Sequence, residues 1–217
     1  MQDSLQIDPR PEIGPESRPD SREDPKEEKI LAAAAEAFLE FGYAGTSMDV
    51  VAQRARASKT TLYTRFPSKE ALFSATISAF CVHGGLGFEI ESLLRQAPEA
   101  ALRHIGRRFL DLILSPEAIR MEQIITGEAP RFPEVARLFH DAGPQKVRAV
   151  VARYFAEATA RGQLAVEDPD FAARHFLMSL KTPNCEGMLG FEPLAPDARD
   201  EFVARSVRLF LKGAAPR

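Results

Sequence analysis

A short segment near the amino end, residues 46–66, constrains the fold more than any other part of the chain. Its sequence is TSMDVVAQRARASKTTLYTRF, which predicts two short helices joined by a tight turn. From Arg54 to Lys69 there are five basic residues and no acidic one. A compact helix pair with a cationic second helix rich in hydroxyl groups is suited to a phosphate backbone and a groove. We therefore interpret the segment as a helix-turn-helix that binds double-stranded DNA.

The overall charge limits how such contact can arise. The net charge of the chain is −3, so the protein is not a polycation that coats nucleic acid. Attraction to phosphate is screened over about 10 Å in salt, so DNA contact has to come from a local basic patch. Residues 1–24 carry seven acidic side chains, three arginines and no hydrophobic period, which predicts a disordered tail. The acidic charge favours an inert extension over an arm that follows DNA.

The rest of the chain has hydrophobic residues at helical spacing and neither a strand alternation nor a hairpin signal, so we predict an all-α protein. A first helix is expected to begin at Asp24-Pro25 and to end at Gly42. The caps of the next three helices are expected to be Thr46, Ser58 and Ser68. Later helices are predicted near residues 69–83, 98–114, 116–128, 133–141, 144–161, 169–189 and 197–212. The proline at position 183 should interrupt the helix that contains it.

One face of the second helix of the motif is expected to be free for DNA. Its other face should pack through Leu62 and Phe66 against a core formed by Phe38, Phe41 and Val51. Threonine side chains can contact base edges, whereas lysine and tyrosine suit phosphate oxygens. The N-termini of helices also attract phosphate, which adds residues at the starts of the neighbouring helices. The residues expected to contact DNA are Thr46, Lys59, Thr60, Thr61, Tyr63 and Lys69.

No motif indicates catalysis, a cofactor or a metal. The chain has no Gly-x-Ser-x-Gly elbow, P-loop or glycine-rich dinucleotide loop, and its four histidines do not fall at metal-ligand spacing. Cys81 and Cys185 are far apart and make no disulfide framework, which indicates a reducing compartment. The amino end has no apolar run, and no stretch approaches 18 uninterrupted apolar residues. We therefore expect a cytoplasmic protein that does not span a membrane and is not an enzyme.

Two parts of the chain resemble a known family. The segment AFLEFGYAGTSMDVVAQRARASKTTLYTRFPSKEALF resembles the DNA-binding region of the TetR family of transcriptional regulators, and the likeness covers about residues 25–75. The segment RMEQIITGEAPRFPEVARLFHDAGPQKVRAVVARYFAEATARGQL resembles the C-terminal domain of the AefR-like branch. The family usually has glycine and a branched apolar residue before Ser58, where this chain has Arg56 and Ala57. If the turn needs a positive φ, Arg56 costs on the order of 1 kcal/mol relative to glycine.

The resemblance implies a homodimer that binds a palindromic operator and responds to a small-molecule effector. Residues 25–70 would form the helix-turn-helix domain, and residues 71–217 would bind the effector, expected to be apolar, and the partner subunit. Effector binding would change the spacing of the two DNA-reading heads and release the operator, which describes a repressor.

The larger part of the chain provides candidate residues for these roles, although the same positions are also consistent with an ordinary hydrophobic core. Phenylalanine and methionine at helical spacing are core residues more often than ligand contacts. The pocket candidates are Phe80, Phe109, Met121, Ile125, Phe155 and Phe176. The family implies that the last two helices form the dimer interface, and the candidates there are Phe171, Leu180, Phe202, Leu209 and Phe210.

Two alternatives remain open at this stage. One is an activator or a ligand-independent regulator with the same fold, which would differ in the position of its operator relative to a promoter. The other is a helical small-molecule carrier whose helix-turn-helix is vestigial. Binding to duplex DNA at two salt concentrations separates the carrier from the regulators.

Overall fold

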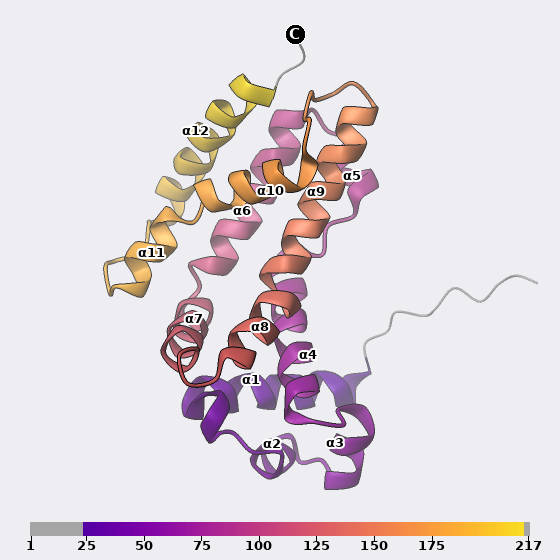
Figure 1. Ribbon diagram of the computed structural model, residues 1–217, viewed down its shortest axis with the longest axis vertical. Coiled ribbons are helices and arrows are strands. Elements are labelled where there is room, and N and C mark those ends of the chain that lie inside the picture. Colours follow the sequence, from indigo (N-terminus) through magenta and orange to yellow (C-terminus); the bar gives the residue numbers. More distant parts are fainter. Residues whose placement is uncertain (1–23, 215–217) are drawn as a thin grey trace, which may run out of the picture.

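The computed structural model describes residues 24–214, and every regular element in that range is a helix, which confirms the all-α prediction. Figure 1 shows the first three helices together at one end of the molecule, with the remaining helices stacked on them. The predicted disordered tail, residues 1–24, lies outside the described residues except for Asp24. The elements of this end are α1 (Pro25–Gly45), α2 (Met48–Ala55), α3 (Lys59–Arg65) and α4 (Lys69–Cys81), which leads into the rest of the molecule.

The larger part of the molecule continues with a π-helical turn and further helices, most of which begin with proline. Proline suits the first helical position for two reasons. Its φ is already close to helical, and an N–H group at this position would have no partner within the helix, so its absence costs nothing. In chain order the elements are η1 (Val82–Leu86), α5 (Ile90–Leu94), α6 (Pro98–Ile113), α7 (Pro116–Glu128), α8 (Pro133–Ala142), α9 (Pro144–Ala160), α10 (Pro169–Ser179), α11 (Thr182–Met188) and α12 (Pro196–Ala214).

Side-chain caps set the starts of the first helices. Asp24 accepts a hydrogen bond from the N–H of Lys26 at 2.9 Å and begins α1. Ser58 and Ser68 cap α3 and α4, as predicted. In each case a side-chain oxygen satisfies an N–H group in the first turn that has no partner within the helix.

The predicted cap of α2 was wrong by one residue. Ser47 caps the helix, because its Oγ accepts the N–H of Val50 at 3.3 Å. The side chain of Thr46 is only 3 % exposed, and its hydroxyl lies 2.7 Å from the carbonyl oxygen of Gly42 and 3.0 Å from that of Ala37. Two adjacent hydroxyl residues fit the same capping pattern, and only the packing of the first one against α1 distinguishes them.

Glycine and proline interrupt the helices where the sequence indicated. Gly42 leaves helical geometry within α1, with φ 73° and ψ 178°. The helix predicted over residues 169–189 is divided into α10 and α11, and Pro183 lies in the first turn of the second of these. The helix expected to reach His83 instead ends at Cys81 and continues as the π-helical turn η1.

The buried residues form two clusters. The lower cluster joins α1 to α4 and contains the aromatic rings of Phe38, Tyr43 and Phe73, with the Phe38 and Phe73 centroids 5.0 Å apart. Leu62 and Phe66 are buried in it as expected. Phe41 is not part of this core: its side chain is 43 % exposed and the guanidinium of Arg54 lies 5.0 Å from its ring centroid.

The lower cluster extends beyond the boundary predicted at residue 70. It includes residues of α7 and α8, namely Met121, Ile125, Val135 and Ala142. The upper cluster lies among α6, α9, α10 and α12 and includes the rings of Tyr154, Phe155 and Phe176. Because α7 and α8 pack on the helix-turn-helix, a displacement of these helices would be transmitted directly to it.

Within residues 24–214, the stretch Lys69–Leu94 is long and apolar enough to cross a membrane by length and composition alone. It comprises α4, η1 and α5. In the folded chain α4 packs against α1 and α8, and η1 packs against α6. A single helix of this kind is weak evidence for a membrane span.

Candidate DNA-binding surface and internal cavity

Helix α3 presents a polar face to solvent. Leu62 anchors its inner side in the lower cluster and is fully buried. Lys59, Thr60 and Tyr63 are exposed, with Tyr63 48 % exposed. Thr61 is half-buried, and its N–H donates to Oγ of Ser58 at 3.1 Å. The outer face therefore offers hydroxyl groups, a phenol and an ammonium group on a rigid helix, which suits contacts to base edges and phosphates.

The ammonium group of Lys59 is held by an acidic neighbour. Its Nζ donates to Oδ2 of Asp49 at 2.7 Å, and this hydrogen bond raises the pKa of Lys59. Both side chains are more than half exposed, at 67 % and 61 %. An ion pair this exposed contributes little stability, so a DNA phosphate can replace Asp49 as the partner of Lys59.

The structure places Lys69 and Thr46 at the joint between α1 and α2. Nζ of Lys69 donates to the carbonyl oxygens of Tyr43 (2.9 Å) and Thr46 (3.1 Å) and lies 4.3 Å from the centroid of the Tyr43 ring. The hydroxyl of Thr46 is equally engaged inside the fold. Both side chains were predicted to contact DNA; in this structure both bind carbonyl groups around the end of α1, and their contact with DNA stays a prediction. Ser47, which caps α2, is exposed beside them.

Arg56 has the left-handed conformation that the turn requires. Its φ is 50° and its ψ is 39°, and it is the one non-glycine residue of the described range with a positive φ. The N–H of Arg56 bonds to the carbonyl of Gln53 at 3.2 Å and so ends α2. The turn before Ser58 therefore does need a positive φ, the condition that the sequence left open. Glycine adopts this conformation without strain, whereas arginine does not.

We expect Arg56→Gly to raise the free energy of unfolding by about 0.5–1 kcal/mol, because it removes left-handed strain at some cost in chain entropy. Chemical denaturation measures this change. Gln53→Gly is the matched control in the same turn, and it should lower stability by about 1 kcal/mol because Gln53 is helical. A loss of stability in Arg56→Gly would show that the arginine side chain contributes more than its backbone conformation costs.

Glu128, at the end of α7, contacts the turn between α1 and α2. Its Oε2 accepts a hydrogen bond from the N–H of Ala44 at 3.3 Å, across 84 positions of sequence. Gly42 lies directly beneath, and a Cβ atom there would lie 2.3 Å from Oε1 of Glu128. The guanidinium of Arg131, three positions further along the chain, lies over the ring of Phe132. No local pattern could have revealed the contact between Glu128 and Ala44.

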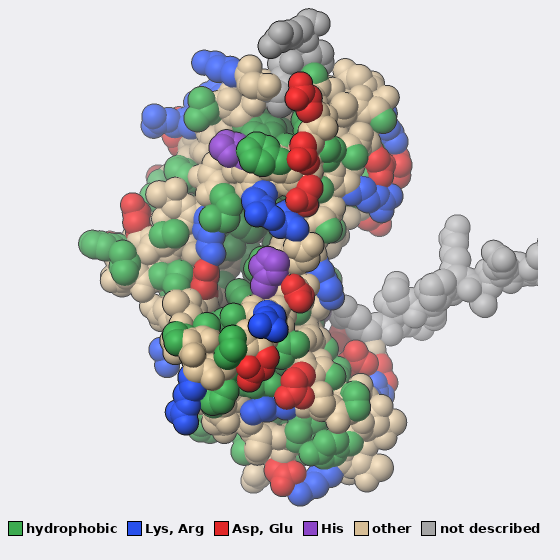
Figure 2. All heavy atoms as spheres, in the orientation of Figure 1, with side chains coloured by type: hydrophobic (Ala, Val, Ile, Leu, Met, Phe, Trp, Pro, Cys, Tyr) green, Lys and Arg blue, Asp and Glu red, His purple; other side chains and the backbone are tan. Residues whose placement is uncertain are grey.

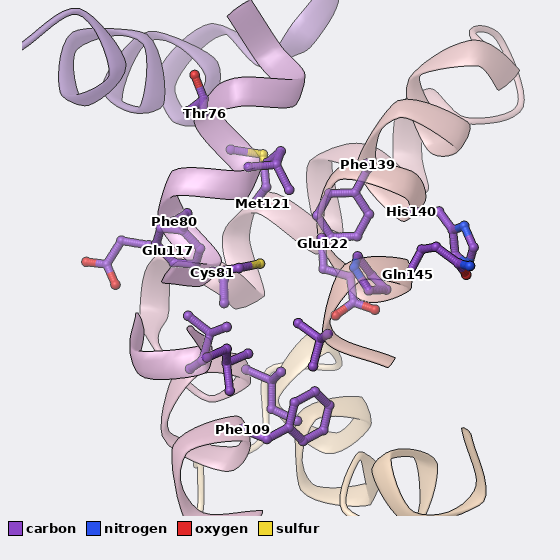
Figure 3. A pocket seen from close by; sticks show the side chains of 18 of the residues that line it. Thr76, Phe80, Cys81, Phe109, Glu117, Met121, Glu122, Phe139, His140 and Gln145 are labelled. Atoms are coloured by element: carbon purple, nitrogen blue, oxygen red, sulfur yellow. The ribbon is translucent and has the colours of Figure 1, made fainter. Parts of the chain in front are cut away.

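A cavity of about 990 Å³ lies above the helix-turn-helix, between α1, α4 and the helices α6 to α10. Figure 3 shows the rings of Phe80 and Phe109, the sulfur of Met121 and the ring of Phe139 around it. The size is that of a site for a drug-sized organic molecule. The polar and charged side chains of the lining are Glu36, Thr76, Glu117, Glu122, His140, Gln145, Arg148, Arg174 and Lys181. Figure 2 shows charged and histidine side chains along the middle of the visible face, over α8 to α10.

Half of the predicted pocket residues line this cavity. Phe80, Phe109 and Met121 do. Phe155 and Phe176 instead pack in the upper cluster, with ring centroids 6.2 Å apart, and Ile125 is buried in the lower cluster. Helical spacing identifies an inward face but cannot tell a packed core from a cavity wall, which explains the three errors.

The predicted dimer residues also divide into two groups. Phe171 and Leu209 are 65 % and 76 % exposed on α10 and α12. Leu180 is fully buried, and the ring centroid of Phe210 lies 5.3 Å from that of Phe155, so these two side chains pack within the monomer. Phe202 is half-buried against the upper cluster. Met178 on α10 is 57 % exposed and also lines the cavity.

Comparison with known proteins agrees with this geometry. Residues 30–76 match the profile of bacterial regulatory proteins of the tetR family, and residues 100–213 match that of the C-terminal domain of AefR-like transcriptional repressors. Among curated proteins, the HTH-type transcriptional regulator RutR of Escherichia coli K12 is 32 % identical over 116 residues. That match covers 52 % of this chain and 45 % of RutR, so it spans about half the length of the relative.

Solved structures extend the similarity over most of the chain. The flavonoid-responsive regulator FrrA is 35 % identical, with a TM-score of 0.66, and the match covers 88 % of this chain and 98 % of FrrA. A protein from Mesorhizobium loti described as a TetR-family regulator is 29 % identical, with a TM-score of 0.71 over 88 % of this chain and 97 % of its own. The helix-turn-helix with its exposed α3, the helical domain with its cavity and these matches show that the chain belongs to the TetR family of transcriptional regulators.

Proposed function

We propose that this protein is a cytoplasmic homodimeric repressor that binds a palindromic operator through α3 and releases it when a small molecule occupies the cavity. The observation that carries the proposal is that a polar, DNA-compatible surface and an apolar cavity lie on opposite sides of the same group of helices. Hydroxyl and ammonium groups face outward on α3, while a large and mostly apolar cavity lies on the other side of α1. Helices α4 and α7 contribute side chains both to the lower cluster, which also contains Leu62 of α3, and to the cavity.

DNA binding would place α3 in the major groove. Thr60, Thr61 and Tyr63 would then face base edges and the adjoining backbone, and Lys59 would exchange Asp49 for a phosphate. Ser47 and the free N–H groups at the start of α2 would contact a second phosphate. In a dimer, two such heads reach adjacent major grooves when they are about 34–36 Å apart.

Two features support the ligand-responsive dimer. Ile77 and Met121 line the cavity and also belong to the lower cluster, so a molecule that displaces them moves the core on which α3 rests. The name of FrrA states that it responds to flavonoids, and that relative favours an aromatic effector here. For the dimer, Phe171, Met178 and Leu209 leave apolar area exposed on α10 and α12, the face that a partner subunit would cover.

We expect Lys59→Ala to weaken binding to all duplex sequences alike. The reason is that a phosphate contact positions the protein without reading bases, so the plot of log affinity against log salt should become shallower by about one for each reading head. Fluorescence anisotropy with a labelled operator and a scrambled duplex measures both effects. Lys212→Ala, in the last turn of α12, is the matched control and should leave affinity and slope unchanged.

An unchanged salt slope in Lys59→Ala would show that Lys59 does not contact phosphate. Failure of the wild-type protein to bind any fragment selected from genomic DNA would overturn the repressor proposal and favour a small-molecule carrier. The genes beside the fragments that do bind would indicate the chemistry of the effector.

A further inference from the structure

Arg148 gives the cavity a feature that a purely apolar effector would not use. It lies on α9, lines the cavity and has a side chain only 17 % exposed. Its Nε is buried and donates no well-formed hydrogen bond within the described residues, although Oδ1 of Asp170 lies 3.0 Å away. A buried donor whose nearby acceptor is poorly aligned is only weakly satisfied, and such groups call for a specific explanation. Of the four buried side-chain atoms of this kind in residues 24–214, Nε of Arg148 alone belongs to a cavity-lining residue.

The acidic residues of the lining do not pair with Arg148. Oε1 of Glu122 accepts a hydrogen bond from Nζ of Lys181 at 2.5 Å, so these two charges compensate each other. Glu36 and Glu117 are exposed on α1 and α7, and Figure 3 shows the carboxylate of Glu117 directed away from the cavity. Among the half-buried charges of the lining, Arg148 therefore has no partner within the lining itself, and its ion-pair partner Asp170 is an exposed residue of α10.

A second guanidinium stands on the neighbouring helix. Arg174 lies on α10, which packs against α9, and it also lines the cavity. One exposed carboxylate, that of Asp170, therefore stands against two arginines on this side of the cavity. Guanidinium groups bind carboxylates through paired, charge-assisted hydrogen bonds, and they do so most strongly where water is partly excluded.

The remaining wall suits an apolar body. The lining from α4, η1 and α6 is dominated by aromatic and aliphatic side chains, which are Ile77, Phe80, Leu86, Phe109, Leu112 and Ile113. We propose that the effector is an amphipathic organic acid, with an aromatic or alicyclic body in this part of the cavity and a single carboxylate bound by Arg148 with help from Arg174. The inference rests on the proposed function, because it names the class of molecule that the same cavity would bind.

Matched ligands and matched variants test the inference. Cinnamate, naphthoate and cyclohexanecarboxylate are each compared with their methyl ester and alcohol by isothermal titration calorimetry at neutral pH. At least one acid should bind the wild-type protein roughly tenfold or more tightly than its neutral analogues, because only the acid satisfies Arg148. Arg148→Met should abolish that preference, and Arg148→Lys should keep part of it. Arg153→Met, an exposed arginine of the same helix paired with Glu157, should keep it in full.

Three outcomes would overturn the inference. They are neutral analogues that bind the wild-type protein as tightly as the acids, an Arg148→Met protein that keeps the preference, and no binding of any acid at millimolar concentration. Circular dichroism checks folding, and Arg148→Gln replaces Arg148→Met if the latter does not fold.

Operator release is measured separately. An acid that binds through Arg148 without releasing DNA would leave the inference intact and count against the proposed repressor mechanism. Release of DNA by neutral molecules alone would support that mechanism and count against the inference.

Discussion

Gly42→Ala is expected to lower the free energy of unfolding by about 2–3 kcal/mol, because two unfavourable effects coincide. The backbone at Gly42 has φ 73° and ψ 178°, a region in which only glycine is found routinely. A Cβ atom there would also lie 2.3 Å from Oε1 of Glu128, which would have to move and would lose its hydrogen bond to the N–H of Ala44. Thermal or urea denaturation monitored by circular dichroism measures the change.

Gly127→Ala is the matched control for this prediction. Gly127 lies in α7 next to Glu128, and nothing lies within 4 Å of its would-be Cβ, so alanine there should stabilise the protein by up to about 1 kcal/mol. The double variant Gly42→Ala, Glu128→Ala separates the two causes. It should recover the part of the loss due to the clash and leave the part due to backbone geometry. A Gly42→Ala protein as stable as the wild type would mean that the turn between α1 and α2 is not held in this conformation.

Thr60→Glu is expected to reduce operator affinity roughly a hundredfold or more while leaving the fold intact, because a carboxylate on the outer face of α3 would meet phosphates and base acceptors. Thr60 is exposed and does not belong to the lower cluster, so the substitution removes no side chain from that core. Anisotropy titrations with a labelled operator measure the affinity, and a denaturation curve confirms the fold.

Thr126→Glu introduces the same chemical change at an exposed position of α7 and should leave operator affinity within about twofold, since screening weakens distant charge. Retained affinity in Thr60→Glu would show that the outer face of α3 does not face DNA. Equal losses in both variants would attribute the effect to net charge rather than to position.

The helix-turn-helix was predictable because its signals are local. Ser58 and Ser68 each supply a cap three positions before the N–H that they bind, and Gly42 marks its own interruption of α1. The αL conformation at Arg56 agrees with the glycine that the family usually has at this position. The cap of α2 was ambiguous because Thr46 and Ser47 are adjacent and both carry a hydroxyl group. They differ in that Thr46 is buried and Ser47 is exposed.

The cavity and its polar groups were less predictable because long-range packing decides them. Phe109 and Phe155 have the same helical periodicity, yet one lines the cavity and the other fills the upper cluster. The contact between Glu128 and Ala44 joins positions 84 residues apart. Arg148 lines the cavity because of how α9 and α10 meet, which the residues beside it in the sequence do not reveal.

The inward position of Lys69 bears on how such a protein finds its operator in a cell. While its ammonium group binds backbone carbonyls, Lys69 adds little to the attraction for phosphate, and Asp49 lowers the positive charge that α3 presents. We therefore expect short residence on random genomic sequence, which depends mainly on phosphate contacts. The protein would then spend little of its time on unrelated sites, and discrimination between sites would depend mainly on the hydroxyl groups of α3.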